Sequence, residues 1–187
     1  GAEQWFFAAG TASSNLEYLR FTSGDTLEYK LLLSSSLDSN VITSQVFRDP
    51  SAWMHIYAYR SSTTFNLYVN GLEVTDFSTS NAPGSSDGMF GKNVRHRIGT
   101  SYGTPSGFLG TYLAELNFVP GSAKAAADFG ETNDDGVWIP KAYSGAYGTN
   151  GFYITGETAG DLGEDFSGNG NDFTSSGLAT TDQMLDT

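Results

Sequence analysis

The chain has 187 residues, enough for one sizeable core, and its 26 aromatic residues (13 Phe, 10 Tyr, 3 Trp) with 16% charged residues exclude a disordered chain. Nine basic against twenty-one acidic residues give a net charge of −12, which excludes a surface that follows phosphates and leaves a neutral sugar or a cation as suitable ligands. The lack of Cys excludes a disulfide scaffold and thiol catalysis, and no apolar run approaches the ~20 residues of a membrane helix, so neither nucleic acid nor membrane insertion is expected.

Short alternating or apolar runs recur along the chain and predict β-strands. Each run is bounded by Gly, Ser, Asn, Asp or Pro, and the runs follow one another at a spacing of roughly ten residues, which is typical of a sandwich or barrel. The predicted strands are residues 4–9, 16–22, 26–33, 41–47, 53–60, 65–69, 72–77, 94–99, 108–119, 137–139 and 151–155. The expected fold class is therefore all-β.

The stretch "FNLYVNGLEV" predicts a β-hairpin. Phe65, Leu67 and Val69 alternate with polar or amphipathic residues, as in a strand with one buried face. Asn70 and Gly71 follow, and both accept the positive φ angles that a tight hairpin turn requires.

Two further elements are predicted towards the C-terminus. Residues 108–119 predict a strand whose even-numbered side chains, from Tyr112 to Phe118, share one face. Residues 121–130, "GSAKAAADFG", predict a connector helix of about two turns, because Ser122 can cap it, alanines favour it and Gly130 can end it.

Four elements, taken in order, carry a family resemblance: Trp53 with His55, the "LYVNG" hairpin, "RIG" at residues 97–99, and "GFLGTYLAELNF". Together they resemble laminin-G-like members of the concanavalin A-like lectin/glucanase superfamily. The resemblance implies a jelly-roll sandwich of two antiparallel sheets, here with one short connector helix, over residues 1–120. Such domains usually begin with an extra strand pair, so we expect the first strands to be missing. Residues 121–187 are expected to pack on the sandwich as part of the same domain.

The C-terminal third has a second resemblance. The stretches "DFGETNDDGVWIPKAYSGAYGTNGFY" and "LGEDFSGNGNDF" resemble poorly characterised proteins of tailed phages and marine viral sequences. This resemblance implies a protein on a virion surface or in the extracellular space. The implied partners are a glycan or host surface, other copies of the chain, or other virion proteins. Two departures, the missing first strand pair and an end where related chains continue, suggest a segment of a longer protein or a sandwich completed by another chain.

The sequence does not favour catalysis. A retaining glycosidase needs two carboxylates about 5 Å apart, and the superfamily's glucanases place them on a Glu-x-Asp-x-x-Glu strand that is absent here. Glu115 is the best strand carboxylate, and it stands alone. His55 is expected to pack on its strand and His96 to be solvated, which gives no triad or zinc site. The chain is therefore expected not to be an enzyme.

Calcium is the one cofactor that the sequence suggests. Alternate oxygen-bearing side chains before a glycine can converge on one cation, as at the start of an Asp-x-Asp-x-Asp-Gly loop. The alternative is a tight turn, because Asn, Asp and Gly are also the residues that turns demand. The candidate ligands are Asp165, Ser167, Asn169, Asn171 and Asp172 in one stretch, and Glu131, Asn133 and Asp135 in another.

Carbohydrate binding is the other interpretation that stays open. Sugar sites combine aromatic platforms with short polar groups on loops. The candidate residues are Tyr102, Trp138, Tyr143, Tyr147 and Asn150. The alternative is that Trp138 and the tyrosines pack the C-terminal segment onto the sandwich.

The expected function is therefore non-catalytic attachment to a host or environmental glycan. A purely structural role, as a decoration, tail or fibre subunit that binds neighbouring chains, is the alternative from another class. Glycoside hydrolysis is the third.

Overall fold

The computed structural model describes residues 1–49 and 51–183, which form two compact units. Unit 1 comprises Gly1–Gly110 and Ala123–Tyr143, and unit 2 comprises Thr111–Ser122 and the described residues from Ser144 onward. In both units the regular elements are β-strands and single-turn 3-10 helices, so the predicted all-β class is confirmed. The predicted boundary at residue 120 stays a prediction.

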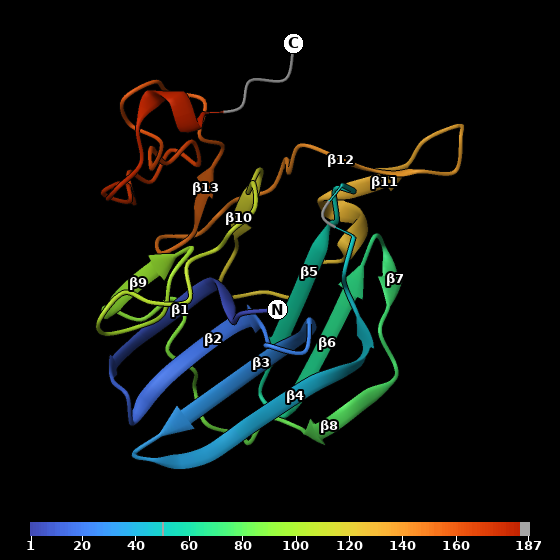
Figure 1. Cartoon of the computed structure of the whole chain (residues 1–187), viewed down its shortest axis with the longest axis vertical. Helices are drawn as coiled ribbons and strands as arrows, with labels where there is room; N and C mark the ends of the chain where they lie inside the picture. The colour runs from blue at the N-terminus through green and yellow to red at the C-terminus, as the bar shows by residue number, and fades with distance from the viewer. Residues whose placement is uncertain (50, 184–187) are drawn as a thin grey trace. The chain divides into compact units, whose positions relative to one another are not determined.

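Unit 1 is built on a six-stranded antiparallel sheet with the order β8-β4-β3-β2-β1-β9 (Figure 1). Its strands are β1 (Gln4–Ala12), β2 (Asn15–Phe21), β3 (Thr26–Leu33), β4 (Ser36–Val46), β8 (Phe77–Asn81) and β9 (Arg95–Ile98). Apart from shifts at the ends, β1, β2, β3, β4 and β9 were predicted from the short runs, whereas β8 overlaps the predicted run 72–77 only at Phe77.

A three-stranded sheet of unit 1 has the order β5-β6-β7. Its strands are β5 (Ile56–Ser61), β6 (Thr64–Val69) and β7 (Leu72–Glu73). The hairpin between β6 and β7 is confirmed, since Asn70 and Gly71 adopt φ angles of 50° and 76°. Both angles are positive, as a two-residue turn of this twist requires.

The two sheets of unit 1 pack through apolar side chains of β3 and β6. Leu31 of β3 is fully buried, Leu67 of β6 is 2% exposed, and the rings of Tyr29 and Phe65 stack with centroids 4.4 Å apart. Burial of each such side chain contributes about 1.5–3 kcal/mol to stability. This packing is that of the predicted sandwich.

Two predicted strands of unit 1 have different bounds in the structure. The run at residues 53–60 is extended only from Ile56, and His55 lies before the strand. The run at 72–77 is divided: β7 ends at Glu73, and the chain then crosses to the large sheet, where β8 begins at Phe77 and pairs with β4.

The prediction of one long strand over residues 108–119 is wrong. Only Leu116–Phe118 form a strand, β10, which pairs with β13 (Phe152–Ile154) in unit 2. The physical reason lies at Glu115, whose φ of 53° turns the backbone out of the extended conformation. Tyr112 is 59% exposed while Leu116 and Phe118 are half-buried, so the predicted face does not run continuously from Tyr112 to Phe118.

The prediction of a two-turn helix at residues 121–130 is also wrong. The segment contains one 3-10 turn, η1 (Ala126–Asp128), and Gly130 begins a strand. Asp128 rather than Ser122 caps the turn, since its carboxylate accepts the Ala125 N–H at 2.8 Å. Helix propensity is a weak preference over so few residues.

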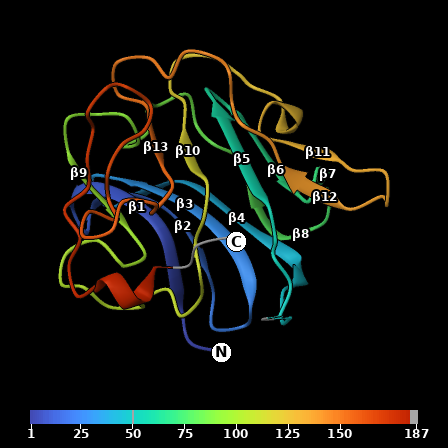
Figure 2. The same ribbon diagram turned by 90° about the horizontal axis from the view of Figure 1, so that it is seen from above.

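A short hairpin and a second 3-10 turn complete the regular elements of the described chain. Strand β11 (Gly130–Thr132) pairs with β12 (Trp138–Pro140), and Figure 2 shows this hairpin beside β6 and β7. A second 3-10 turn, η2 (Thr180–Asp182), lies in unit 2. No helix among residues 1–49 and 51–183 is both long and apolar enough to cross a membrane.

Candidate ligand-binding site

The outer face of the three-stranded sheet is aromatic. Because side chains alternate along a strand, Phe65 and Leu67 point to the core while Tyr68 points the other way. On the neighbouring strand, Tyr57 pairs directly with Tyr68, and Tyr59 follows two residues later on the same face. Three half-buried tyrosines therefore lie together on the outside of β5 and β6.

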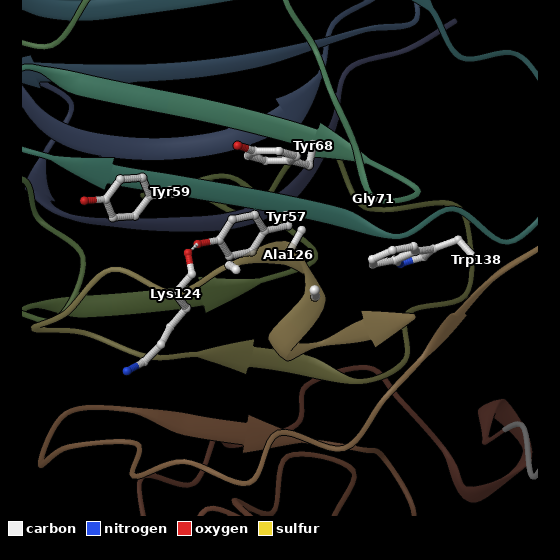
Figure 3. A pocket seen from close by; sticks show the side chains of 9 residues that line it. Tyr57, Tyr59, Tyr68, Gly71, Lys124, Ala126 and Trp138 are labelled. Carbon is white, nitrogen blue, oxygen red and sulfur yellow. Dashed lines mark hydrogen bonds between the residues drawn. The ribbon is translucent and has the colours of Figure 1, made fainter. Parts of the chain in front are cut away.

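Residues 124–129 return over this face and turn it into a pocket. The Tyr57 hydroxyl donates a hydrogen bond of 2.5 Å to the Lys124 carbonyl, and the Tyr57 and Phe129 rings stack at 5.8 Å. The resulting pocket has a volume of about 290 Å³ (Figure 3). It is lined by Tyr57, Tyr59, Tyr68, Gly71, Lys124, Ala125, Ala126, Ala127 and Trp138.

Trp138 forms one end of the pocket, and two glycines make room for its ring. A Cβ atom on Gly71 would lie 2.3 Å from Trp138 Cζ3, and one on Gly130 would lie 2.4 Å from Nε1. The indole Nε1 is buried and finds no hydrogen-bond partner within the described ranges. The His55 ring lies 5.7 Å from that of Trp138. Only glycine at both positions lets the indole approach the backbone this closely.

The pocket has aromatic walls and few charges. Burial, with smaller contributions from Tyr59, Tyr68 and Asp128, raises the pKa of Tyr57 to about 12. Burial lowers the pKa of His55 below its ordinary value, so the ring is neutral at neutral pH. The Lys124 ammonium lies 5.8 Å from the centroid of the Tyr143 ring. Among the described residues, no carboxylate lines the pocket.

A family model described as the concanavalin A-like lectin/glucanases superfamily matches residues 1–127. The chain belongs to this superfamily. The match includes both sheets of the sandwich and the part of the covering segment 124–129 up to Ala127. Trp138 and most of unit 2 lie beyond the match. Comparisons with curated proteins and with solved structures return no match. The superfamily includes lectins and glycoside hydrolases, so membership alone does not decide between binding and hydrolysis.

The five residues that were predicted to contact sugar lie in different parts of the structure. In unit 1, Trp138 lines the pocket. Tyr143 does not line the pocket, and its ring stacks on Phe129 with centroids 4.9 Å apart. Tyr102 packs against a core cluster that includes Trp5 and Tyr18.

The other two predicted sugar contacts belong to unit 2. The Tyr147 hydroxyl donates to Asn117 Oδ1 at 2.5 Å, and its ring stacks on Tyr153 at 6.2 Å. Asn150 is exposed. The role of all five residues in ligand binding stays a prediction.

Sequence reasoning missed Tyr57, Tyr59 and Tyr68 as site residues. A usable signal was present, because the alternation of residues 65–69 already directs Tyr68 away from the core, and Tyr57 and Tyr59 have the spacing of one strand face. The return of residues 124–129 had no such local signal.

In unit 2, the predicted calcium loop is closed by its own hydrogen bonds. Asp165, 8% exposed, accepts the Tyr153 and Ser167 N–H groups on Oδ1, at 2.8 and 2.9 Å. Its Oδ2 accepts the Ser167 hydroxyl at 2.8 Å and the Asn171 N–H at 2.9 Å. Burial alone would raise the pKa of Asp165, but these donors outweigh it and lower the pKa.

The remaining side chains of this loop also bond to the chain. Asn169 donates to the carbonyls of Gly148 and Gly151, and Asn171 donates to those of Thr149 and Gly151. Asp172 Oδ1 accepts the Asp165 N–H at 2.9 Å. These bonds are those of an Asx-stabilised turn. Calcium at the loop stays a prediction.

The second predicted calcium stretch is the β11–β12 hairpin of unit 1. Glu131 lies in β11 rather than in a loop, and its Oε2 is 3.8 Å from Lys141 Nζ. Asn133 Oδ1 accepts the N–H groups of Asp135 and Val137, at 3.0 and 2.9 Å. Within residues 1–49 and 51–183, no group of three or more His, Asp or Glu could hold a metal ion.

Two groups weighed for catalysis are placed differently from the prediction. Glu115 precedes β10 and accepts a hydrogen bond from the Tyr153 hydroxyl, so it is not a strand carboxylate. His96 lies in β9 and is half-buried rather than solvated. Its ring stacks on Phe7 at 5.6 Å and its Nδ1 lies 2.8 Å from the Val94 carbonyl. Burial lowers its pKa.

Proposed function

We propose that the chain is a non-catalytic carbohydrate-binding protein that holds a sugar in the pocket on the outer face of β5 and β6. The observation that carries the proposal is the grouping of Tyr57, Tyr59, Tyr68 and Trp138 around one pocket of about 290 Å³. Aromatic rings offer large apolar faces on which the C–H faces of sugars can pack. Membership in a superfamily that contains lectins supports the same function.

The composition of the pocket supports binding over hydrolysis. Glycosidases act through a pair of carboxylates on either side of the scissile bond. In the part of the chain that the structure describes, the lining residues include neither Asp nor Glu. Measurable hydrolysis of a β-glucan by the purified protein would contradict the non-catalytic proposal.

For the biological setting, we propose a virion or extracellular surface, where the pocket attaches the particle or cell to a glycan. The resemblance of the C-terminal third to phage proteins supports this setting. The alternative is a decoration, tail or fibre subunit that binds neighbouring chains. An ordered assembly that buries Tyr59 and Tyr68 between subunits would favour the alternative.

A glycan array followed by calorimetry with the best ligand tests the proposal. We expect Tyr68→Ala to weaken the affinity about tenfold or more, because it removes one wall of the pocket. Phe108→Ala is the matched control, since Phe108 is an aromatic residue of unit 1 that is 66% exposed and does not line the pocket. Equal affinities of the two variants, or no glycan binding at all, would contradict the proposal.

A further inference from the structure

The walls of the pocket offer mostly aromatic faces and methyl groups, and the hydroxyls of Tyr59 and Tyr68 are the side-chain groups that could bond to a ligand there, apart from the Lys124 ammonium. Among the described residues, no carboxylate and no side-chain amide lines the pocket. The Tyr57 hydroxyl is already bonded to the Lys124 carbonyl, and Ala125, Ala126 and Ala127 add only small apolar surfaces. Such a lining favours a ligand group that needs no hydrogen-bond partner.

The aromatic rings follow one another along the pocket, and those of Tyr57 and Tyr68 lie next to each other. The Tyr57 and Tyr68 centroids are 5.6 Å apart and their planes are tilted by 50°. Tyr59 lies beyond them on one side and Trp138 on the other, as Figure 3 shows. A cation that rests against the tilted rings of Tyr57 and Tyr68 can lie within about 6 Å of their centroids, where a ring face attracts it.

The charges around the pocket suit a cationic ligand. The whole chain has a net charge of −12, and Asp128 follows the wall segment Ala125–Ala127 directly. The Lys124 ammonium lies 5.8 Å from the Tyr143 ring, and Figure 3 shows it directed away from Tyr57 and Tyr68. The lysine therefore contributes its backbone and stem to the wall while its charge points elsewhere.

We propose that the pocket is an aromatic cage for a trimethylammonium group, of the kind that choline carries. This group has no polar hydrogen that it could donate and no lone pair with which it could accept a hydrogen bond, so it needs no polar partner from walls that are mostly aromatic. Its positive charge can rest against the neighbouring rings of Tyr57 and Tyr68, and the aromatic ring next to them adds a further wall. The inference goes beyond the proposed function: a glycan that carries choline would satisfy both, but the cage requires no sugar.

Titration with choline chloride, followed by calorimetry, tests the cage against its neutral isostere 3,3-dimethylbutan-1-ol. The two molecules have the same shape and differ in the charge of the central atom. We expect choline to bind at least about tenfold more tightly than the alcohol. Equal affinities, or no saturable binding of choline, would overturn the proposal. Phosphatidylcholine vesicles form a second arm: binding there as well as to free choline assigns the group to a lipid, and binding to free choline alone excludes that source.

Variants separate the cage from the fold and from the proposed function. Tyr68→Phe retains the ring and should retain choline binding, whereas Tyr68→Leu should weaken it about tenfold or more. Phe108→Leu is the control outside the pocket. Loss of binding in Tyr68→Phe as well would show that the hydroxyl, not the ring, holds the ligand, and would overturn the cage. A glycan that binds without any choline binding overturns the cage alone, while choline binding without any glycan binding overturns the proposed function alone.

Discussion

Tyr57 and Lys124 are joined by a hydrogen bond of 2.5 Å across 67 positions of sequence. The Tyr57 hydroxyl on β5 donates to a backbone carbonyl of residues 124–129, so this bond attaches that segment to the sheet face that it covers. Because Tyr57 is half-buried, an acceptor that lost its donor there would not regain a full hydrogen bond from water.

Tyr57→Phe should therefore lower the free energy of unfolding by about 1–2 kcal/mol. Urea denaturation followed by circular dichroism measures the change. Tyr59→Phe is the matched control, because the Tyr59 hydroxyl makes no hydrogen bond within residues 1–49 and 51–183 and lines the same pocket. Equal losses in the two variants would mean that the bond to Lys124 does not stabilise the wall.

Glu17 is a buried carboxylate that holds the loop before β9. It is 2% exposed and accepts the Tyr29 hydroxyl at 2.6 Å and the N–H groups of Met89 and Phe90 at 2.5 and 2.8 Å. Glu17→Leu removes the acceptor of these three hydrogen bonds, two of which are buried, so we expect a loss of about 3 kcal/mol or more by chemical denaturation. Tyr29→Phe removes one of these bonds and should cost about 1 kcal/mol. A loss in Glu17→Leu no larger than in Tyr29→Phe would contradict this account.

Asp165 should make the stability of the chain depend on pH in the acidic range. Its pKa in the folded state is lowered, so its hydrogen bonds stabilise fully above the ordinary pKa of about 3.9 and are lost as the pH falls through the folded value. Asp165→Asn should therefore lower the melting temperature at about pH 7, and the difference from wild type should shrink below about pH 4.

Asp161→Asn is the control for that series, because Asp161 is an exposed aspartate of unit 2 whose carboxylate makes no hydrogen bond in the described ranges. Melting curves recorded by circular dichroism across this pH range compare the three proteins. A difference between wild type and Asp165→Asn that stays constant down to about pH 3 would refute the assigned role.

Gly130→Ala should disturb the pocket from a position that does not itself line it. The added Cβ would lie 2.4 Å from Trp138 Nε1, so the indole has to move. Gly130 has no positive φ, and the backbone itself tolerates alanine. We expect weaker ligand binding by about tenfold and a shift in tryptophan fluorescence. A Trp138→Phe background should abolish the fluorescence shift, and a shift that persists there would assign it to another tryptophan.

The loop around Asp165 should keep its fold without a cation. Protein donors already surround the carboxylate, so we expect EDTA to leave the melting temperature unchanged. A marked fall on chelation, reversed by added calcium and absent in Asp165→Asn, would instead establish a structural calcium ion there. Calorimetric titration of chelator-treated protein measures any weaker binding.

Local signals were sufficient for much of the fold. Asn70 and Gly71 predicted their hairpin because the required positive φ angles depend on these two residues alone. Glu115 gave no warning of its left-handed backbone, since residues with a side chain adopt it rarely. The interruption of the strand at residues 108–119 was therefore not predictable.

Only some of the residues that form the pocket could be predicted from the sequence. Trp138 was a candidate, and the outward direction of Tyr68 follows from period-two alternation. The missing information was the contact between Tyr57 and Lys124, a pairing that depends on tertiary packing rather than on any local pattern. The same limit explains the predicted helix, where Asp128 closed a single turn instead.

The passage of the chain from β7 to β8 has a mechanical consequence. Residues 74–76 are a short tether between the two sheets, with the Val74 N–H bonded to the Leu67 carbonyl at 2.8 Å and Asp76 bonded to Ser44 on β4. Tension applied to a ligand at Tyr68 is therefore transmitted through covalent backbone into the large sheet. There the force reaches the β4–β8 ladder, whose backbone hydrogen bonds hold β8 in the large sheet.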